Sequence, residues 1–227
     1  MRSWSNFCGK TGLRGNEPLA VRTAGASAIH LESEPMKESL SVRRRLHMNE
    51  NDLKKYADLA RKGGASSVKQ INPSSVVTAA WVRLKCQFGC GGYNYSYNCP
   101  PHTPTAEETR RVLDCYNRAL LFHIETLPTR DRGRRLTKFR QMLIDLEGEM
   151  FKDGYYKAFV FLAGPCRLCK ECGKATETSC NHRDRVRPSM EACGIDVFQT
   201  ARNNDCHIET LREETEPRNT YCLMLVD

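Results

Sequence analysis

Twelve cysteines occur among 227 residues, and most of them fall into two short segments. The second segment is the more specific, because it has the spacing C-x2-C-x2-C-x7-C with Cys166, Cys169, Cys172 and Cys180. Three cysteines at two-residue gaps can supply three corners of a cubane, with the fourth ligand from a separate position. Zinc is more often held by two separated C-x2-C pairs. The spacing therefore predicts a [4Fe-4S] cluster, with zinc or redox-active thiols as alternatives.

The first segment places Cys86, Cys90 and Cys99 at the spacing C-x3-C-x8-C. Two glycines follow Cys90, and glycines let the backbone approach closely with amide donors facing sulfur. A proline follows Cys99, as in the cysteine–proline step that closes ferredoxin cluster runs. The spacing differs from the C-x3-C-x2-C of radical S-adenosylmethionine enzymes, so that class is rejected. This segment offers three thiolates to a second metal centre.

A fourth ligand for the first segment must come from elsewhere in the chain, and Cys193 is the candidate. Alternatively, the two segments exchange their fourth ligands, so that Cys180 closes the first site and Cys99 or Cys193 closes the second. His102 and His182 each follow a candidate cysteine by two or three residues. Each is either a nitrogen ligand, a donor that orients a sulfur, or a solvated loop histidine.

The remaining four cysteines are left out of the ligand set. Cys115 and Cys222 fall in helix and strand patterns, where cysteine behaves as a small buried hydrophobe. Cys206 precedes a predicted strand, and Cys8 lies near the N-terminus.

The charge and the absence of an export pattern indicate a compartment. The formal net charge is +8; residues 1–47 carry +4 of it and residues 48–227 carry the other +4. The longer part is nearly balanced, so its charge does not favour a nucleic-acid protein. No run approaches the ~20 apolar residues of a membrane span, and the start lacks the apolar centre of a secretory signal. We expect a cytoplasmic protein, where clustered cysteines more often bind metal than form disulfides.

Two domains of unequal character are expected. Residues 1–47 have no sustained periodicity and are predicted to be a disordered N-terminal extension, with residues 48–227 as the cysteine-rich metal-binding domain. The folded protein starts near Met48 in one interpretation, with the preceding residues as a tail or an upstream over-translation. In the other interpretation those residues are a short unstructured arm.

The periodicity of residues 48–227 predicts about five helices and about five strands, interleaved. The helices are expected after Asn51, after Asn72-Pro73, after the capping box Thr105–Glu108, over Arg132–Phe151 and from Asp196 to Arg202. The strands are expected at Ser67–Ile71, Leu120–Ile124, Lys157–Leu162, Ile208–Leu211 and Tyr221–Leu225. This order fits an α/β or α+β class, with a small mixed sheet covered by helices and two cysteine-rich loops at one end.

Two further groups of side chains carry open interpretations. A basic cluster opens the long helix and is either a solvated face or a contact for phosphate or an acidic partner: Arg130, Arg132, Arg134, Arg135, Lys138 and Arg140. These cations sit at the unfavourable end of the helix dipole. Tyr93, Tyr95 and Tyr97 lie between Cys90 and Cys99, where they pack over the metal loop, shield a cluster or form a substrate wall.

Several short sequence motifs together resemble those of one family, the cysteine-rich predicted metal-binding proteins of bacteria and archaea. They are Trp81–Cys86, Cys99–Pro101, Pro104–Thr105, Glu108–Arg110, Gly164–Cys166 with Cys169 and Cys172, and Arg187–Phe198. The resemblance covers roughly residues 50–226. It implies metal binding through eight cysteines, the seven of the two segments together with Cys193. It implies no reaction, because the family has no settled activity. Cys206 and Cys222 depart from its pattern.

Three functions follow as hypotheses. The first is an iron–sulfur protein with one or two [4Fe-4S] clusters that exchanges electrons with a redox partner protein. The second is a zinc-binding module whose sites use four cysteines, or three cysteines and one histidine. The third is an enzyme in which Cys86, Cys90 and Cys99 leave one cluster corner open, with an acid or base such as His102 nearby. The sequence does not decide whether the protein is an enzyme.

Overall fold

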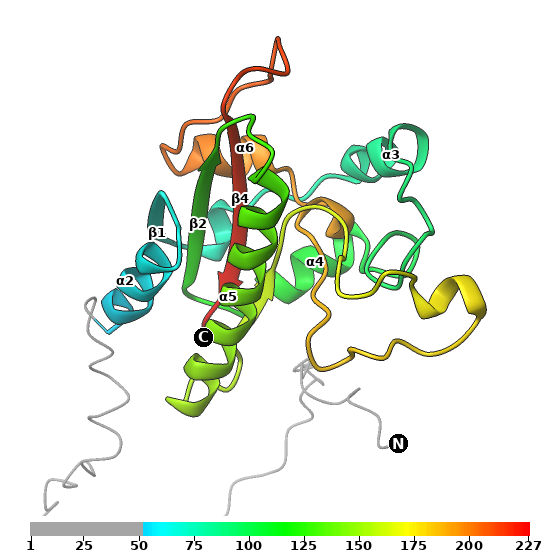
Figure 1. Ribbon diagram of the computed structural model, residues 1–227. Helices are drawn as coiled ribbons and strands as arrows, with labels where there is room; N and C mark the ends of the chain where they lie inside the picture. The colour runs from blue at the N-terminus through cyan, green and yellow to red at the C-terminus, as the bar shows by residue number, and fades with distance from the viewer. Residues whose placement is uncertain (1–51) are drawn as a thin grey trace, which may run out of the picture. The chain divides into compact units, whose positions relative to one another are not determined.

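The computed structural model describes residues 52–227, so the predicted extension over residues 1–47 and the cap Asn51 lie outside the described residues. Within the described part, four antiparallel strands form one sheet in the order β1-β2-β4-β3 (Figure 1). The strands are β1 (Ser67–Ile71), β2 (Ala119–Thr126), β3 (Phe159–Phe161) and β4 (Arg218–Leu225). The helices are α2 (Lys54–Lys62), α3 (Ala80–Gly89), α4 (Ala106–Leu113), α5 (Arg132–Lys152) and α6 (Val197–Asn203), with short 3-10 turns at Pro73–Ser75, Gly173–Thr176 and Glu191–Cys193.

Helices cover both faces of this sheet. Leu120 and Phe122 of β2 pack with α2 and α5 in one apolar cluster. Leu121 points to the opposite face, where it packs with Leu113 of α4 and Ala201 of α6. Successive residues of a strand point to opposite faces, so a strand covered on both sides is buried along its length. The predicted α+β class is confirmed.

Short sequence signals set several helix starts as predicted. Thr105 and Glu108 form the capping box of α4, because Thr105 Oγ1 accepts from Glu108 N (3.2 Å) and Glu108 Oε2 accepts from Thr105 N (2.8 Å). The Asp196 carboxylate accepts a backbone amide at the start of α6 (2.9 Å). Asn72 Oδ1 accepts from Ser74 N (2.9 Å). These bonds satisfy backbone donors that a helix start leaves without an intrahelical partner.

The helix predicted after Asn72 is interrupted. A 3-10 turn covers Pro73–Ser75, and α3 begins only at Ala80, whose preceding residue Ala79 has an extended backbone. The backbone between them pairs with a distant segment: Thr78 forms an antiparallel bridge with Ile195, and Ala79 N donates to a carbonyl of that segment (2.8 Å). This tertiary pairing overrides the local helical spacing.

Two further expectations about the sheet are wrong. The sheet is antiparallel rather than mixed, and it has four strands because Ile208–Leu211 is irregular. Ile208 is buried in the apolar cluster, whereas Leu211 is exposed, so the segment contributes a side chain without pairing its backbone. In residues 52–227 no helix combines the length and apolar character needed to cross a bilayer.

Candidate metal centres

Both cysteine segments lie on the same side of the sheet in Figure 1, and they contact each other. Tyr97 Oη of the first segment donates to Thr178 O of the second (2.7 Å). Asn98 Nδ2 donates to Arg187 O (3.4 Å). The predicted placement of two cysteine loops at one end of the fold matches this arrangement.

The sheet edge closes the base of the second segment. Leu162 directly follows the edge strand β3 and forms a parallel bridge with Ser189. Leu162 N donates to Pro188 O (2.8 Å), and Leu162 O accepts from Met190 N (2.8 Å). Residues 163–188, which carry four cysteines, are therefore held at both ends.

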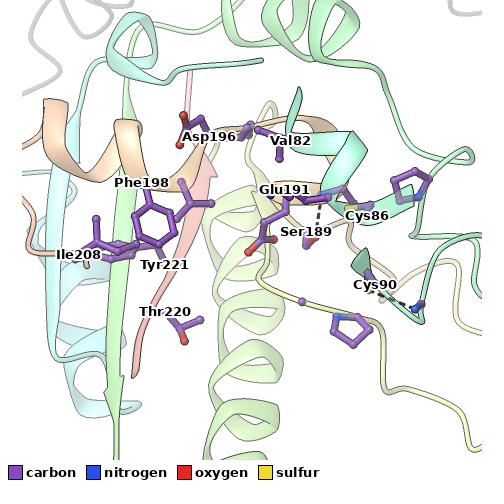
Figure 2. Close-up of a pocket in the computed structure, with 18 of the residues that line it drawn as sticks. Val82, Cys86, Cys90, Ser189, Glu191, Asp196, Phe198, Ile208, Thr220 and Tyr221 are labelled. Carbon is purple, nitrogen blue, oxygen red and sulfur yellow. Dashed lines mark hydrogen bonds between the residues drawn. The ribbon is translucent and has the colours of Figure 1, made fainter. Parts of the chain in front are cut away.

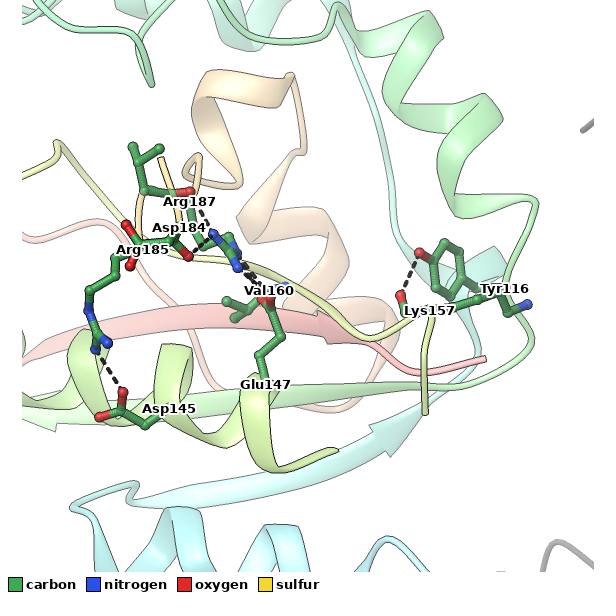
Figure 3. Close-up of polar contacts among 9 residues, drawn as sticks. Tyr116, Asp145, Glu147, Lys157, Val160, Asp184, Arg185 and Arg187 are labelled. Carbon is green, nitrogen blue, oxygen red and sulfur yellow. Dashed lines mark hydrogen bonds and ion pairs between the residues drawn. The ribbon is translucent and has the colours of Figure 1, made fainter. Parts of the chain in front are cut away.

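A buried ion pair strengthens this base (Figure 3). Glu147 of α5 accepts from Val160 N of β3 (2.8 Å) and from Arg187 Nη2 and Nε (2.6 and 3.0 Å). The side chains of Arg187 and Glu147 are only 16% and 10% exposed. One carboxylate thus connects the long helix, the edge strand and the end of the second segment.

Four cysteines of the second segment line one small cavity of about 40 Å³: Cys166, Cys169, Cys172 and Cys180. Burial raises the pKa of the Cys166 thiol, and the nearby charges of the other three thiols act in the same direction. His182 N donates to Cys180 Sγ (3.4 Å), which is the kind of amide donor that stabilises a thiolate. The four cysteines predicted for this segment therefore line one cavity.

Among residues 52–227, no three His, Cys, Asp or Glu side chains lie close enough together to hold one metal ion. Metal binding at the second segment would therefore draw its sulfur atoms inward, a coupling between binding and folding that is common in metal sites. The donor set fits the group, because four thiolates can hold either an iron–sulfur cubane or a zinc ion.

The first segment lines a much larger cavity of about 770 Å³ (Figure 2). Cys86 and Cys90 lie at the end of α3 and contribute to its wall, together with Cys99. Phe198 and Tyr221 lie across the cavity from Cys86 in Figure 2. The three candidate thiols therefore border a space that can hold a small organic molecule, since such pockets measure about 300–1,000 Å³.

Glu191 is an additional polar group in this wall, and sequence reasoning did not identify it as a candidate site residue. Burial raises the pKa of the Cys86 thiol, and the charges of Cys90, Glu191 and Cys99 raise it further, whereas Arg83 lowers it. Glu191 and the three thiols line the same cavity. The Glu191 Oε2 atom is buried and accepts no hydrogen bond from the described residues. The sulfurs do receive donors, as Ser96 Oγ donates to Cys99 Sγ (3.2 Å).

Cys193 does not line this cavity. Its side chain is fully buried among the apolar residues on the α4 and α6 face of the sheet, and burial raises its pKa to about 12. Its assignment as the fourth ligand of the first segment stays a prediction, as does the exchange of ligands between the segments. Cys180 lies with the other cysteines of its own segment, which favours the unexchanged arrangement.

The histidines and the other cysteines occupy different environments. His182 lines the small cavity, whereas His102 pairs with Asn94 Oδ1 (2.9 Å). Cys222 is buried as predicted. Cys115 is exposed, so its predicted burial is wrong; α4 ends at Leu113 and leaves Cys115 in the following turn. Cys206 is half-buried, and Cys8 lies outside the described residues.

The tyrosines divide between the two cavities. Tyr93 lines the large cavity, and Tyr95 and Tyr97 line the small one. This placement agrees with packing over the metal loops.

One family model matches the chain over residues 69–226, and its description is "Predicted metal-binding protein (DUF2284)". The matched range contains all eight candidate ligand cysteines. No curated protein and no solved structure matches the chain.

Proposed function

Because the chain belongs to this family of predicted metal-binding proteins, we propose that it is an iron–sulfur protein that transfers electrons. The observation that carries the proposal is the gathering of Cys166, Cys169, Cys172 and Cys180 around one cavity. Four thiolates would close all four corners of a [4Fe-4S] cluster, which leaves the cluster suited to electron transfer rather than to binding a substrate.

The surroundings of this segment support exchange with a partner protein. Cys169 is exposed, so a redox partner can approach the cluster edge without a rearrangement of the fold. In the described residues, none of the eight candidate ligand cysteines forms a disulfide bond. Thiols persist in a reducing compartment, and we therefore propose a cytoplasmic location.

The first segment favours a second function, an enzymatic site. Cys86, Cys90 and Cys99 border a cavity of about 770 Å³ that Cys193 does not line. A cluster held by three thiolates would supply a Lewis-acidic iron corner to a molecule in that cavity. The Glu191 carboxylate lies in the same wall and would accept a proton at Oε2. Phe198 and Tyr221 would hold an apolar body and exclude water.

Metal and acid-labile sulfide content, with an absorption spectrum, test the iron–sulfur proposal on protein purified without oxygen. We expect equal iron and sulfide, with a brown chromophore. The Cys169→Ala and Cys172→Ala variants should each lose iron, whereas the matched control Cys206→Ala should keep it. Zinc without sulfide would replace the proposal with a zinc module, and full iron retention in both variants would remove the second segment from the site.

The two segments can be tested separately. If each holds a cluster, Cys90→Ala should lose about half of the iron while the cluster of the second segment keeps its spectrum. Added small ligands that perturb the electron paramagnetic resonance spectrum of the wild type, but not that of Cys90→Ala, would support the open corner. A spectrum that no ligand perturbs, iron unchanged in Cys90→Ala, or iron lost in Cys193→Ser would each contradict it.

A further inference from the structure

A second group of side chains, apart from the cysteines, surrounds a cavity of about 570 Å³. The cavity lies where β2 ends at Thr126 and β4 begins at Arg218, next to the first half of α5. Its wall contains six cationic side chains and no carboxylate: Arg132, Arg134, Lys138, Arg140, Arg167 and Arg218. Three threonines also line the cavity: Thr126, Thr137 and Thr220.

Only one of these six cations forms an ion pair with a carboxylate of the described residues. Arg134 forms one exposed ion pair with Asp131 at 4.0 Å. In the part of the chain that the structure describes, none of the other five is in an ion pair. Charges of one sign around a concave surface raise the local concentration of counter-ions.

Two of the arginines are also incompletely hydrogen-bonded. Three buried side-chain nitrogen or oxygen atoms in the described residues have no hydrogen-bond partner, and two of them are Arg140 Nε and Arg218 Nε. A buried donor without a partner costs about 1–3 kcal/mol. An anion that reached either Nε atom would supply the missing acceptor.

Arg140 is held in place in spite of unfavourable surroundings. Burial lowers the pKa of Arg140 and the like charge of Arg167 acts in the same direction, whereas the charges of Cys222, Glu191 and Cys166 oppose this shift. Its Nη2 atom packs against Gly164, where an added Cβ would lie 2.9 Å from Nη2. The positive end of the α5 dipole acts on the cations of the first turn, Arg132 and Arg134. An anion in the cavity would relieve each of these costs.

We propose that this basic cavity binds the phosphate group of a small phosphorylated molecule. Phosphate monoesters carry a charge of about −1.5 to −2 at neutral pH, so one such group offsets more of the six charges than a carboxylate does. Guanidinium groups match phosphate oxygens with two parallel hydrogen bonds. Since Pro165, Arg218 and Thr220 also line the large cavity, an organic body attached to the phosphate has space beside the binding group.

Titration calorimetry on the full-length, metal-loaded protein at about 0.15 M salt tests the site, with phenyl phosphate and inorganic phosphate as probes. Benzoate is the control ligand, because it keeps the aromatic ring and replaces the phosphate with a carboxylate. We expect phenyl phosphate to bind with a Kd below about 1 mM. Arg140→Gln and Arg218→Gln should each weaken this binding about tenfold or more. Arg135→Gln should change it less than about twofold, because Arg135 is exposed on the same helix outside the cavity.

Three outcomes would overturn the proposal. The first is that neither phenyl phosphate nor inorganic phosphate binds detectably. The second is that benzoate binds as tightly as phenyl phosphate. The third is that Arg135→Gln weakens phenyl phosphate binding as much as Arg140→Gln and Arg218→Gln do. If Arg140→Gln does not fold, Arg218→Gln and thermal unfolding of the wild type decide the question. A bound anion stabilises the folded protein by RT ln(1 + c/Kd), where c is its free concentration, and so raises its melting temperature. A wild-type melting temperature that phenyl phosphate leaves unchanged at about 10 mM, roughly ten times the expected limit of Kd, would overturn the site.

Discussion

Replacing Glu147 by alanine should destabilise the protein strongly, because this buried carboxylate accepts hydrogen bonds from two partners. The substitution leaves the Arg187 guanidinium without a counter-charge and Val160 N without an acceptor. Removing one member of a buried ion pair costs about 3–5 kcal/mol. A buried donor without a partner costs about 1–3 kcal/mol. Since Arg187 keeps some contact with water, we expect a total loss of about 4 kcal/mol, a large share of the roughly 5–15 kcal/mol that stabilises a typical protein.

Urea-induced unfolding, followed by circular dichroism, measures this loss. The chain offers a matched control two residues earlier on the same helix, where Asp145 accepts from Arg185 Nη2 (2.7 Å). That pair is 59% and 37% exposed, so Asp145→Ala should cost only about 0–1 kcal/mol. The reasoning is refuted if Glu147→Ala and Asp145→Ala lower the free energy of unfolding equally. Glu147→Gln should fall between them, since its amide oxygen can still accept from Val160 N.

Three smaller predictions concern other sites. Burial raises the pKa of Cys222 to about 12, so this thiol should resist labelling by iodoacetamide at pH 8 in the native protein. Cys115 is exposed and should be labelled. Equal labelling rates of the two cysteines would contradict this. Burial also raises the pKa of Tyr221 to about 12, above its unfolded value near 10. The stability that Tyr221 contributes is therefore present below pH 10 and is lost as the pH rises from about 10 to about 12. In urea unfolding at a series of pH values, the free energy of unfolding of Tyr221→Phe should fall less steeply over this range than that of the wild type. Gly194 has φ +75°, and an added Cβ would lie 2.8 Å from the start of α4. Gly194→Ala should therefore lower the free energy of unfolding by about 1–3 kcal/mol. The control is Gly148→Ala, because an added Cβ at Gly148 in α5 meets nothing within 4 Å. If calorimetry gives Gly194→Ala a melting temperature no lower than that of Gly148→Ala, the predicted strain is absent.

The elements that the sequence predicted correctly are those with strong local signals. The capping box at Thr105 and the cap at Asp196 depend on bonds within three residues, so spacing alone identifies them. The apolar face of α5 is also a local signal, because Phe139, Leu143 and Met150 recur at helical spacing and are buried together. Each of these signals requires no knowledge of the rest of the fold.

The elements that the sequence predicted wrongly depend on partners far along the chain. The break before α3 exists because Thr78 pairs with Ile195. The residues near Thr78 contain no pattern that predicts this pairing. Ile208 is buried without strand pairing, because an apolar side chain can fill a core from an irregular segment. Burial and pairing are separate properties, and hydrophobic spacing reports only the first.

The candidate sites divide in the same way. Closely spaced cysteines are brought together by their own loop, so the set around Cys166 could be predicted from spacing. Glu191 and Arg218 reach their cavities through the order of the sheet and the bridge at Ser189, which residue spacing does not encode. The same limit applies to any fourth ligand of the first segment.

The closed base of the second segment has a consequence for how this loop can vary. Because Leu162 pairs with Ser189 and Glu147 binds Arg187, the ends of residues 163–188 are joined whether or not the interior is ordered. The bridge and the ion pair at the sheet edge offset the entropy cost of closing this loop. Each doubling of the loop length should then lower stability by only about 0.6 kcal/mol. Insertions between Cys172 and Cys180 are therefore expected to change the metal loop while the sheet keeps its stability.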